Sequence, residues 1–298
     1  MFELNDRIVV GSRESALAVA QSMTVVDFLR SKHPGMDVEL LTMKTTGDRI
    51  LDRTLDKVGG KGLFVKELDA ALRQHRADVT VHSLKDVPME VPEDLPILCC
   101  SRREDPRDAL VLRAGLPELP KRPVIGTASL RRTIQLKALF PDCEIVPVRG
   151  NLQTRLRKLD EGQFDALALA AAGLKRMGLE HHVSRVFGVD EVIPAAGQGI
   201  MAVQGRGDFD RTLLEGYADA DAWCAATAER AFVRELDGGC TSPVCAHVVL
   251  NGESVHLTGL YYGESDGSWR RGSVEGLRSE AEQLGIQLAQ TLRDGREA

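Results

Sequence analysis

Strand-like runs alternate with helical patterns through the first two thirds of the chain, and this alternation limits the possible folds more than any other feature. Each repeat of the pattern starts with a short β-branched or apolar run, passes a glycine or polar turn and continues with helical spacing. The expected strands are 8–10, 38–43, 78–82, 109–112, 124–126, 144–148 and 165–170. This order is typical of parallel or mixed sheets with helices on both faces, where ligands bind at the carboxyl ends of the strands.

The pattern changes near residue 221. A helix is expected first, followed by a glycine turn, three strands separated by hairpin turns, and a last helix. The expected ranges are helix 223–236, strands 244–250, 255–262 and 269–274, and helix 279–292. The sequence therefore predicts an α/β protein, with two mixed-sheet halves around an interdomain cleft and a small α+β C-terminal domain. It shows no internal repeat.

Composition sets the class of protein. With 298 residues, of which 43% are hydrophobic, the chain can form a substantial core and two or three domains. The first seven residues carry charges where a signal peptide needs an apolar run, and no stretch approaches membrane-spanning length, so we expect a cytoplasmic protein without a membrane partner. A net charge of −6 argues against non-specific nucleic-acid binding, so an anionic ligand requires a local basic cleft.

The six cysteines do not indicate disulfides or a metal site. A chain of this length needs no covalent cross-links, the cysteines contain no CxxC pair, and the histidines lack ligand spacing. Cys99 and Cys100 close an apolar run and are expected to be buried in a strand. We expect Cys143, Cys224 and Cys245 to be structural thiols as well.

Basic residues gather in four loops, each placed where an expected strand is followed by a helix. The loops are 11–15 with Arg13 and Ser15, 126–132 with Thr127, Ser129, Arg131 and Arg132, 149–155 with Arg149 and Arg155, and 173–176 with Arg176. Helix N-termini present unpaired N–H groups and a positive dipole end, and arginine adds a planar fork that matches a carboxylate. The loops contain no phosphate-binding or dinucleotide glycine motif, which favours carboxylate ligands. The alternative is that each arginine is a solvated helix residue.

The segment His82–Pro88 follows an expected strand directly and ends in a proline that stops its continuation. Asp86 is therefore expected to project from a strand end. The alternative is an aspartate that caps a turn and pairs with Lys85. Strand alternation is expected to bury His82, and we do not assign it a catalytic role.

Two glycines, Gly238 and Gly239, precede Cys240 and allow close backbone approach, which leaves its thiol on an accessible turn. The alternative is a buried cysteine that opens a strand. A second alternative is a cysteine hydrolase that pairs Cys240 with a histidine such as His247.

Together these segments resemble the porphobilinogen deaminase family, and the match covers nearly the whole chain. The matching runs are 11–18, 47–48, 59–67, 82–88, 106–110, 126–132, 149–155, 172–178, 194–199 and 236–243. The resemblance implies a transferase of tetrapyrrole (heme) biosynthesis that condenses four porphobilinogen molecules head to tail with release of ammonia. Condensation takes place on a covalent dipyrromethane primer, and hydrolysis then frees hydroxymethylbilane.

The resemblance also implies roles for individual residues. Cys240 is expected to carry the dipyrromethane through a thioether, and Asp86 is expected to be the catalytic carboxylate. The expected cofactor-binding residues are Lys85, Asp86, Thr127, Ser129, Arg131 and Arg132, and the expected substrate-binding residues are Arg13, Ser15, Lys61, Arg149, Arg155 and Arg176. Lys61 lies in a glycine-rich loop that is expected to close over the cleft.

The family fold implies two domains that resemble type II periplasmic binding proteins, 1–100 with 200–217 and 105–193, and a third domain, 221–298, that carries the cofactor cysteine. The expected hinge lies near 101–107 and 193–199, and the family implies a monomer. The competing hypothesis for this architecture is a non-catalytic two-domain anion-binding protein, in which Asp86 and Cys240 have no role.

Overall fold

The computed structural model describes residues 7–49, 65–239, 242–263 and 267–295. The chain divides into two compact units. Unit 1 consists of Met1–Arg103 and Ile200–Trp223, and unit 2 consists of Glu104–Gly199 and Cys224–Ala298.

Unit 1 is built on a five-stranded sheet with the order β2-β1-β3-β10-β4. Its strands are β1 (Arg7–Arg13), β2 (Asp37–Met43), β3 (Val79–Ser83), β4 (Ile97–Cys100) and β10 (Met201–Gly205). β1 is parallel to β2 and β3, whereas β10 is antiparallel to both β3 and β4. The antiparallel strand therefore comes from a late part of the sequence that returns to this sheet.

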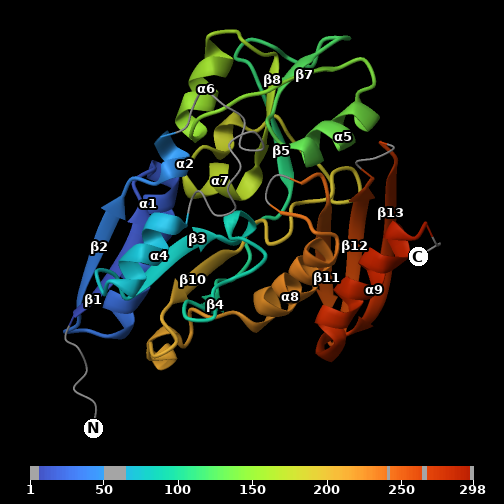
Figure 1. Cartoon of the computed structure of the whole chain (residues 1–298). Helices are drawn as coiled ribbons and strands as arrows, with labels where there is room; N and C mark the ends of the chain where they lie inside the picture. The colour runs from blue at the N-terminus through green and yellow to red at the C-terminus, as the bar shows by residue number, and fades with distance from the viewer. Residues whose placement is uncertain (1–6, 50–64, 240–241, 264–266, 296–298) are drawn as a thin grey trace. The chain divides into compact units, whose positions relative to one another are not determined.

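Helices cover both faces of this sheet (Figure 1). α1 (Ala16–Lys32) packs on the face that carries Val10 and Val81, and α4 (Lys66–Arg73) packs on the face of Val9. The shorter helices of the unit are α2 (Thr46–Arg49), η1 (Leu84–Asp86) and η3 (Arg211–Leu214). Alternate side chains of each strand thus enter two separate cores, as the strand period requires.

The first sheet of unit 2 has the same topology, with the order β7-β6-β8-β5-β9. Its strands are β5 (Asp108–Leu112), β6 (Val124–Gly126), β7 (Glu144–Val146), β8 (Ala166–Ala170) and β9 (Arg185–Val186). β6 is parallel to β7 and β8, and β5 is antiparallel to β8 and β9. β5 therefore takes the place that β10 has in unit 1, and a structural repeat exists where the sequence shows none.

Helices also cover both faces of this second sheet. α5 (Leu130–Leu139) packs on the face of Ile125. α6 (Leu152–Asp160) and α7 (Ala171–Arg176) pack on the face of Leu167, and η2 (Glu180–His182) follows α7. The mixed sheet is therefore buried on both sides, as the near-continuous apolar strand 166–170 predicts.

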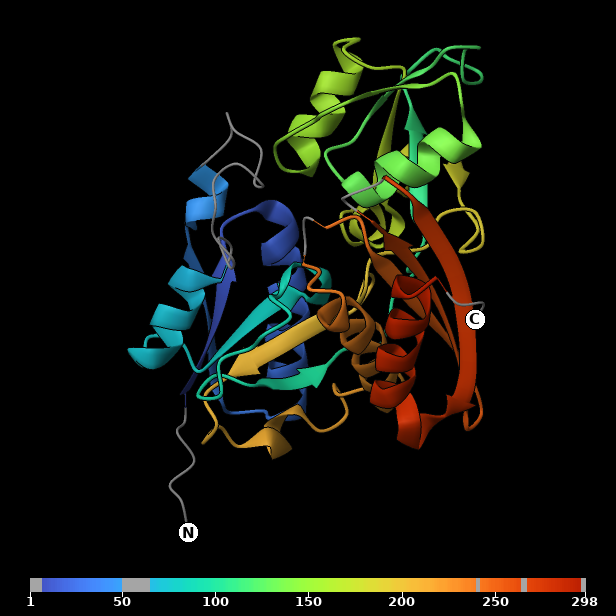
Figure 2. The same ribbon diagram turned by 45° about the vertical axis from the view of Figure 1, so that its right-hand side comes forward.

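The C-terminal part of unit 2 is a three-stranded antiparallel sheet of β11 (Cys245–Asn251), β12 (Ser254–Tyr262) and β13 (Trp269–Leu277). Figure 2 shows α8 (Ala220–Glu235) and α9 (Ala281–Arg293) against one face of it, and η4 (Arg278–Glu280) precedes α9. The two helices touch at Gly285, where a Cβ atom would lie 2.3 Å from the Ala228 carbonyl oxygen. Only glycine permits this approach.

The structure confirms the predicted fold class of two mixed α/β sheets and a small α+β C-terminal region. β7 ends at Val146 and not at residue 148, because Pro147 has no N–H for the ladder. β10 was not predicted as a strand.

Cys99, Cys100 and Cys245 are buried, as expected, but Cys143 and Cys224 are only half-buried, and none of these five described cysteines forms a disulfide. Among the described residues, no helix is both long and apolar enough to cross a membrane.

Candidate functional site

The predicted residues of unit 1 follow the carboxyl ends of two parallel strands. Arg13 is the last residue of β1, and Ser15 caps α1, where its Oγ accepts a hydrogen bond from the Ala18 N–H at 3.4 Å. Asp86 ends η1, directly after β3. Since β1 and β3 are parallel neighbours, these residues lie at one edge of the sheet.

The turn that carries Asp86 is fixed by hydrogen bonds at its start. The Leu84 N–H donates to the Ile200 carbonyl oxygen at 3.0 Å, and Gln21 Nε2 donates to Ser83 Oγ at 2.9 Å. Asp86 itself is half-buried, and its carboxylate makes no hydrogen bond or ion pair with any described residue. A carboxylate held in place without a partner among the described residues can interact with a ligand, whereas pairing of Asp86 with Lys85 is not observed.

The β6–α5 connection places four predicted residues of unit 2. Thr127 Oγ1 accepts a hydrogen bond from the Ser129 N–H at 3.2 Å, and Ser129 Oγ caps α5 by accepting from the Arg132 N–H at 3.4 Å. Ser129 is a good N-cap because its short hydroxyl reaches an unpaired N–H of the first turn. Arg131 and Arg132 are therefore in the first turn of α5.

Arg131 and Arg132 are both buried, only 4% and 7% exposed, and both bind Asp108 at the start of β5. Arg131 Nη1 lies 2.6 Å from Asp108 Oδ2, and Arg132 Nη2 lies 2.8 Å from Asp108 Oδ1. Burial opposes ionisation of Asp108, but the two guanidiniums prevail and hold the pKa of this carboxyl well below its usual range. The alternative of solvated helix arginines is therefore wrong for this pair.

The arginine pair retains one net positive charge, because Asp108 is the only carboxylate that contacts either guanidinium among the described residues. A buried charge without a counter-ion is unfavourable, so a second carboxylate would be stabilised here. Arg131 uses Nη1 for both of its contacts, to Asp108 and to the Ile193 carbonyl oxygen. Its Nε and Nη2 make no hydrogen bond within the described part of the chain. The donor set fits a ligand that carries carboxylates.

Two further arginines flank the turn between β7 and α6. Arg155 Nε donates to the Gly150 carbonyl oxygen at 2.9 Å, and Gly150 has a φ of +113°, which favours glycine. Asn151 Oδ1 caps α6 by accepting from the Thr154 N–H at 2.9 Å. Arg149 Nε is buried and has no hydrogen-bond partner among the described residues, so it is a donor available to a ligand.

Arg176 lies at the C-terminal end of α7, after β8, and its Nη2 donates to the Gly199 carbonyl oxygen at 2.6 Å. β6, β7 and β8 are parallel neighbours, so the connections that hold the predicted residues of unit 2 all start at the same edge of its sheet. The structure therefore groups these arginines within unit 2. Lys61 and Cys240 lie outside the described residues.

Sequence reasoning assigned no role to Asp108 or to Gln198, although both lie in the runs that carry the family resemblance. Gln198 Nε2 donates to Asp108 Oδ1 at 2.9 Å. The available signal was an acidic residue at the first position of an apolar strand, where a buried carboxylate needs a cationic partner.

His82 is buried in unit 1, as expected. Burial, with a smaller contribution from nearby Arg13, lowers the pKa of His82 to about 4, against an opposing effect of a hydrogen bond with Gln204. Thr80 Oγ1 lies 2.9 Å from His82 Nε2. The imidazole is therefore neutral near pH 7 and adds no charge beside Arg13.

Asp69 of α4 is a second buried titratable group in unit 1. Burial raises the pKa of Asp69 to about 6, and Asp94 acts in the same direction, whereas Arg73 and Gln204 oppose the shift. Asp69 Oδ1 and Gln204 Oε1 each lack a hydrogen-bond partner in the described part of the chain. Relative to the unfolded chain, the folded protein therefore favours the protonated carboxyl of Asp69.

Asp69→Asn is expected to gain stability relative to wild type as the pH rises from about 5 to about 8, by on the order of 1–3 kcal/mol. Because the pKa of Asp69 is higher in the folded protein than in the unfolded chain, the protonated carboxyl stabilises the folded state. This stabilisation is fully present below the unfolded-state pKa of 3.8 and is lost as pH rises through about 6. Thermal unfolding at the two pH values measures the change, with the exposed Asp142→Asn as control. An equal difference at both pH values would contradict the assignment.

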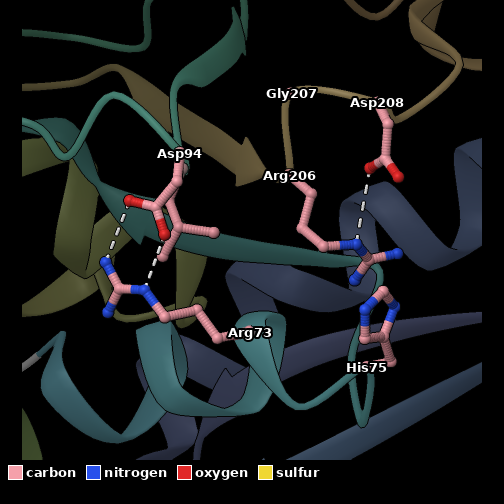
Figure 3. Close-up of a pocket in the computed structure, with 7 residues that line it drawn as sticks. Arg73, His75, Asp94, Arg206, Gly207 and Asp208 are labelled. Carbon is pink, nitrogen blue, oxygen red and sulfur yellow. Dashed lines mark hydrogen bonds and ion pairs between the residues drawn. The ribbon is translucent and has the colours of Figure 1, made fainter.

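A cavity of about 350 Å³ in unit 1 contains none of the predicted site residues. Figure 3 shows that its charged groups are already paired: Arg73 Nε lies 2.7 Å from Asp94 Oδ2, and Arg206 Nε lies 3.4 Å from Asp208 Oδ1. Its lining includes Arg73, His75, Asp94, Arg206, Gly207 and Asp208. We assign no role in the reaction to this cavity.

The structure also shows the surroundings of the residues that were considered for hydrolase or metal chemistry. His247 is buried, and its Nδ1 lies 3.5 Å from Glu229 Oε1 inside the C-terminal part of unit 2. No group of histidine, cysteine and acidic side chains in the described ranges could hold a metal ion.

The fold and these side chains define a class: an α/β protein with arginines at the carboxyl ends of its strands and an aspartate, Asp86, that has no hydrogen bond or ion pair with a described residue. Comparison with known proteins gives the family. Residues 8–214 match the family model for the porphobilinogen deaminase dipyromethane cofactor binding domain, and residues 223–294 match that for the porphobilinogen deaminase C-terminal domain. The chain belongs to the porphobilinogen deaminase family.

Similar curated proteins match nearly the whole chain. A porphobilinogen deaminase from Acetivibrio thermocellus is 51% identical over 292 residues, which cover 98% of this chain and 100% of the relative. One from Alkaliphilus oremlandii is 52% identical over 283 residues, or 95% of each chain. Among solved structures, the methionine-binding protein MetQ has a TM-score of 0.45 and 14% identity, and the match covers 74% of this chain and 93% of MetQ.

Proposed function

We propose that this chain condenses four porphobilinogen molecules head to tail with release of ammonia, on a covalently bound dipyrromethane, and then hydrolyses the product to release hydroxymethylbilane. The observation that carries the proposal is the match of both family models, which together leave only short segments of the chain unmatched. The arginines, and the Asp86 carboxylate that has no partner among the described residues, agree with this activity.

The residues of this chain fit a cofactor that bears acetate and propionate groups. Cys240 anchors it through a thioether, and Lys85, Asp86, Thr127, Ser129, Arg131 and Arg132 hold it. The excess positive charge of the buried arginine pair supports this role, since a carboxylate placed there completes the charge balance. When bound, the dipyrromethane supplies the pyrrole carbon to which the first substrate is joined.

Asp86 is the catalytic carboxylate of this proposal. Loss of ammonia leaves positive charge on the ring of the incoming porphobilinogen, and an ionised carboxylate beside the pyrrole N–H stabilises that charge in the transition state. The fixed backbone of η1 supports the role, because a pre-oriented group needs little rearrangement during the reaction.

The remaining basic residues bind the carboxylates of the substrate and of the growing chain. They are Arg13, Ser15, Lys61, Arg149, Arg155 and Arg176. Each pyrrole carries an acetate and a propionate, so a chain of linked rings needs several cationic partners. The buried Nε of Arg149, which has no hydrogen-bond partner in the described ranges, and the N-terminus of α1 at Ser15 support such contacts.

The proposal includes the organisation of the protein. Domain 1 consists of 1–100 with 200–217, domain 2 of 105–193 and domain 3 of 221–298. The protein acts in the cytoplasm as a monomer on a small-molecule substrate, without nucleic acid or membrane. Its net charge of −6 supports the absence of a nucleic-acid partner.

The intact mass of the purified protein under denaturing conditions tests the proposal, together with porphobilinogen consumption. We expect a mass equal to that of the chain plus two pyrrole rings. We also expect ammonia to be released as porphobilinogen is consumed. A non-catalytic anion-binding protein would show the mass of its sequence and consume nothing. A cysteine hydrolase would show an alkylatable thiol at Cys240 in its active form.

A further inference from the structure

We propose that Asp108 is a positioning residue for the reaction, which holds the guanidiniums of Arg131 and Arg132 in a fixed orientation for the carboxylates of the cofactor. The inference rests on the proposed function, because it assumes that this pair binds the cofactor. Asp108 itself touches no ligand in this scheme and acts through the two arginines.

The contacts of Asp108 fix both arginines at once. Its Oδ2 accepts a hydrogen bond from Arg131 Nη1 at 2.6 Å. Its Oδ1 accepts from Arg132 Nε at 3.1 Å and from Arg132 Nη2 at 2.8 Å. One carboxylate at the start of β5 therefore joins two consecutive residues of α5, and its 1% exposure excludes competing water.

A backbone carbonyl oxygen accepts a further hydrogen bond from each guanidinium, and in Arg131 this bond comes from the same nitrogen that binds Asp108. Arg131 Nη1 also donates to the Ile193 carbonyl oxygen at 2.7 Å, and Arg132 Nη1 donates to the Ala168 carbonyl oxygen at 3.1 Å. Two separate contacts define the plane of a guanidinium, which a single contact does not. The side chains are therefore oriented before a ligand arrives, and ligand binding need not immobilise them.

Gln198 fixes the carboxylate in turn. Its Nε2 donates to Asp108 Oδ1 at 2.9 Å and to the Pro106 carbonyl oxygen at 2.7 Å. The orientation of Asp108 is thus set by a residue of the segment that follows β9. This arrangement resembles the support that a metal ligand receives from its outer hydrogen-bond partner, which orients the group that binds.

The charge of Asp108 is as important as its shape. It neutralises one of two adjacent buried cations and leaves the other for a ligand carboxylate. Without it, two guanidiniums would repel each other at low dielectric and lose the anchor that holds them inside. The contact also leaves Arg131 Nε and Nη2, the side-on edge of the guanidinium, without a hydrogen bond among the described residues, and a carboxylate can bind that edge through two parallel bonds.

Cofactor loading tests the proposal. Protein produced without cofactor is incubated with porphobilinogen at several concentrations. The mass of the protein under denaturing conditions is measured over time and shows how fast the two rings are added. Asp108→Asn, which keeps the shape but removes the charge, is expected to load about 10²-fold more slowly than wild type at low porphobilinogen concentration. The concentration for half-maximal loading should rise, a change that a purely structural role would not produce in a folded protein.

Asp165→Asn is the matched control. Asp165 belongs to the same sheet region and accepts a hydrogen bond from the Val124 N–H at 2.9 Å, with Arg113 3.7 Å away, but it contacts neither arginine of the pair. It is expected to load like wild type. A folded Asp108→Asn protein with wild-type loading would overturn the proposal, and so would equal defects in the two variants.

A second variant covers the case in which Asp108→Asn does not fold. Gln198→Met removes the amide that orients Asp108 and leaves the ion pairs, so cofactor loading should slow by about tenfold, and the melting temperature should fall because two buried hydrogen bonds are lost. Unchanged loading would overturn the proposal. If wild-type protein never gains the two rings, the proposed function fails; if it does gain them and these variants do too, only the role of Asp108 fails.

Discussion

Asp86→Asn is expected to lower turnover by about 10²–10³-fold and to leave the protein folded. Asparagine keeps the size of the side chain and loses the negative charge that would stabilise the cationic pyrrole. The hydrogen bonds that fix η1 involve the Leu84 backbone and the Ser83 side chain, so the substitution does not disturb them. The change should appear in kcat and kcat/KM alike, because the lost contact belongs to the transition state.

The measurement is steady-state consumption of porphobilinogen, with thermal unfolding to confirm the fold. Asp27→Asn is the control, since Asp27 is an exposed aspartate on α1 of the same unit. It is expected to retain wild-type turnover. Near-normal turnover of a folded Asp86→Asn protein would remove the carboxylate from the mechanism.

Local patterning predicted most of the secondary structure because its signals are short-range. Strand 124–126 is bounded by Pro123 and Gly126, and the turn between β11 and β12 contains Gly252 with a φ of +57°. Strand order depends on long-range pairing, which such patterns do not encode. The insertion of β10 between β3 and β4 was therefore missed, and with it the topology that the two units share.

The sequence predicted which loops carry the residues of the candidate site, but it did not predict the contacts that their side chains make. The strand-to-helix pattern predicted that Ser15 and Ser129 lie in such connections, but it did not predict that each serine caps the helix that follows. The burial of Arg131 was not predictable, since its partner Asp108 is 23 residues away and lies on a different element. An arginine pattern alone cannot distinguish a solvated side chain from one held by a buried carboxylate.

Cys240→Ala is expected to abolish both stable cofactor attachment and turnover. A thioether needs the sulfur of this residue, and alanine offers no atom that can replace it. The denatured mass of the variant should equal that of its sequence, without the two pyrrole rings. Porphobilinogen consumption should fall to the background rate, because condensation has no anchored primer on which to begin.

Cys143→Ala is the matched control, because Cys143 is a half-buried thiol that packs beside the core under α5 and has no proposed role in the reaction. It should carry the two rings and turn over substrate like wild type. A Cys240→Ala protein that is active and carries the rings would show that another residue forms the covalent bond. An active protein without them would show that a tethered primer is not required, and the arginine pair held by Asp108 would then need a different ligand.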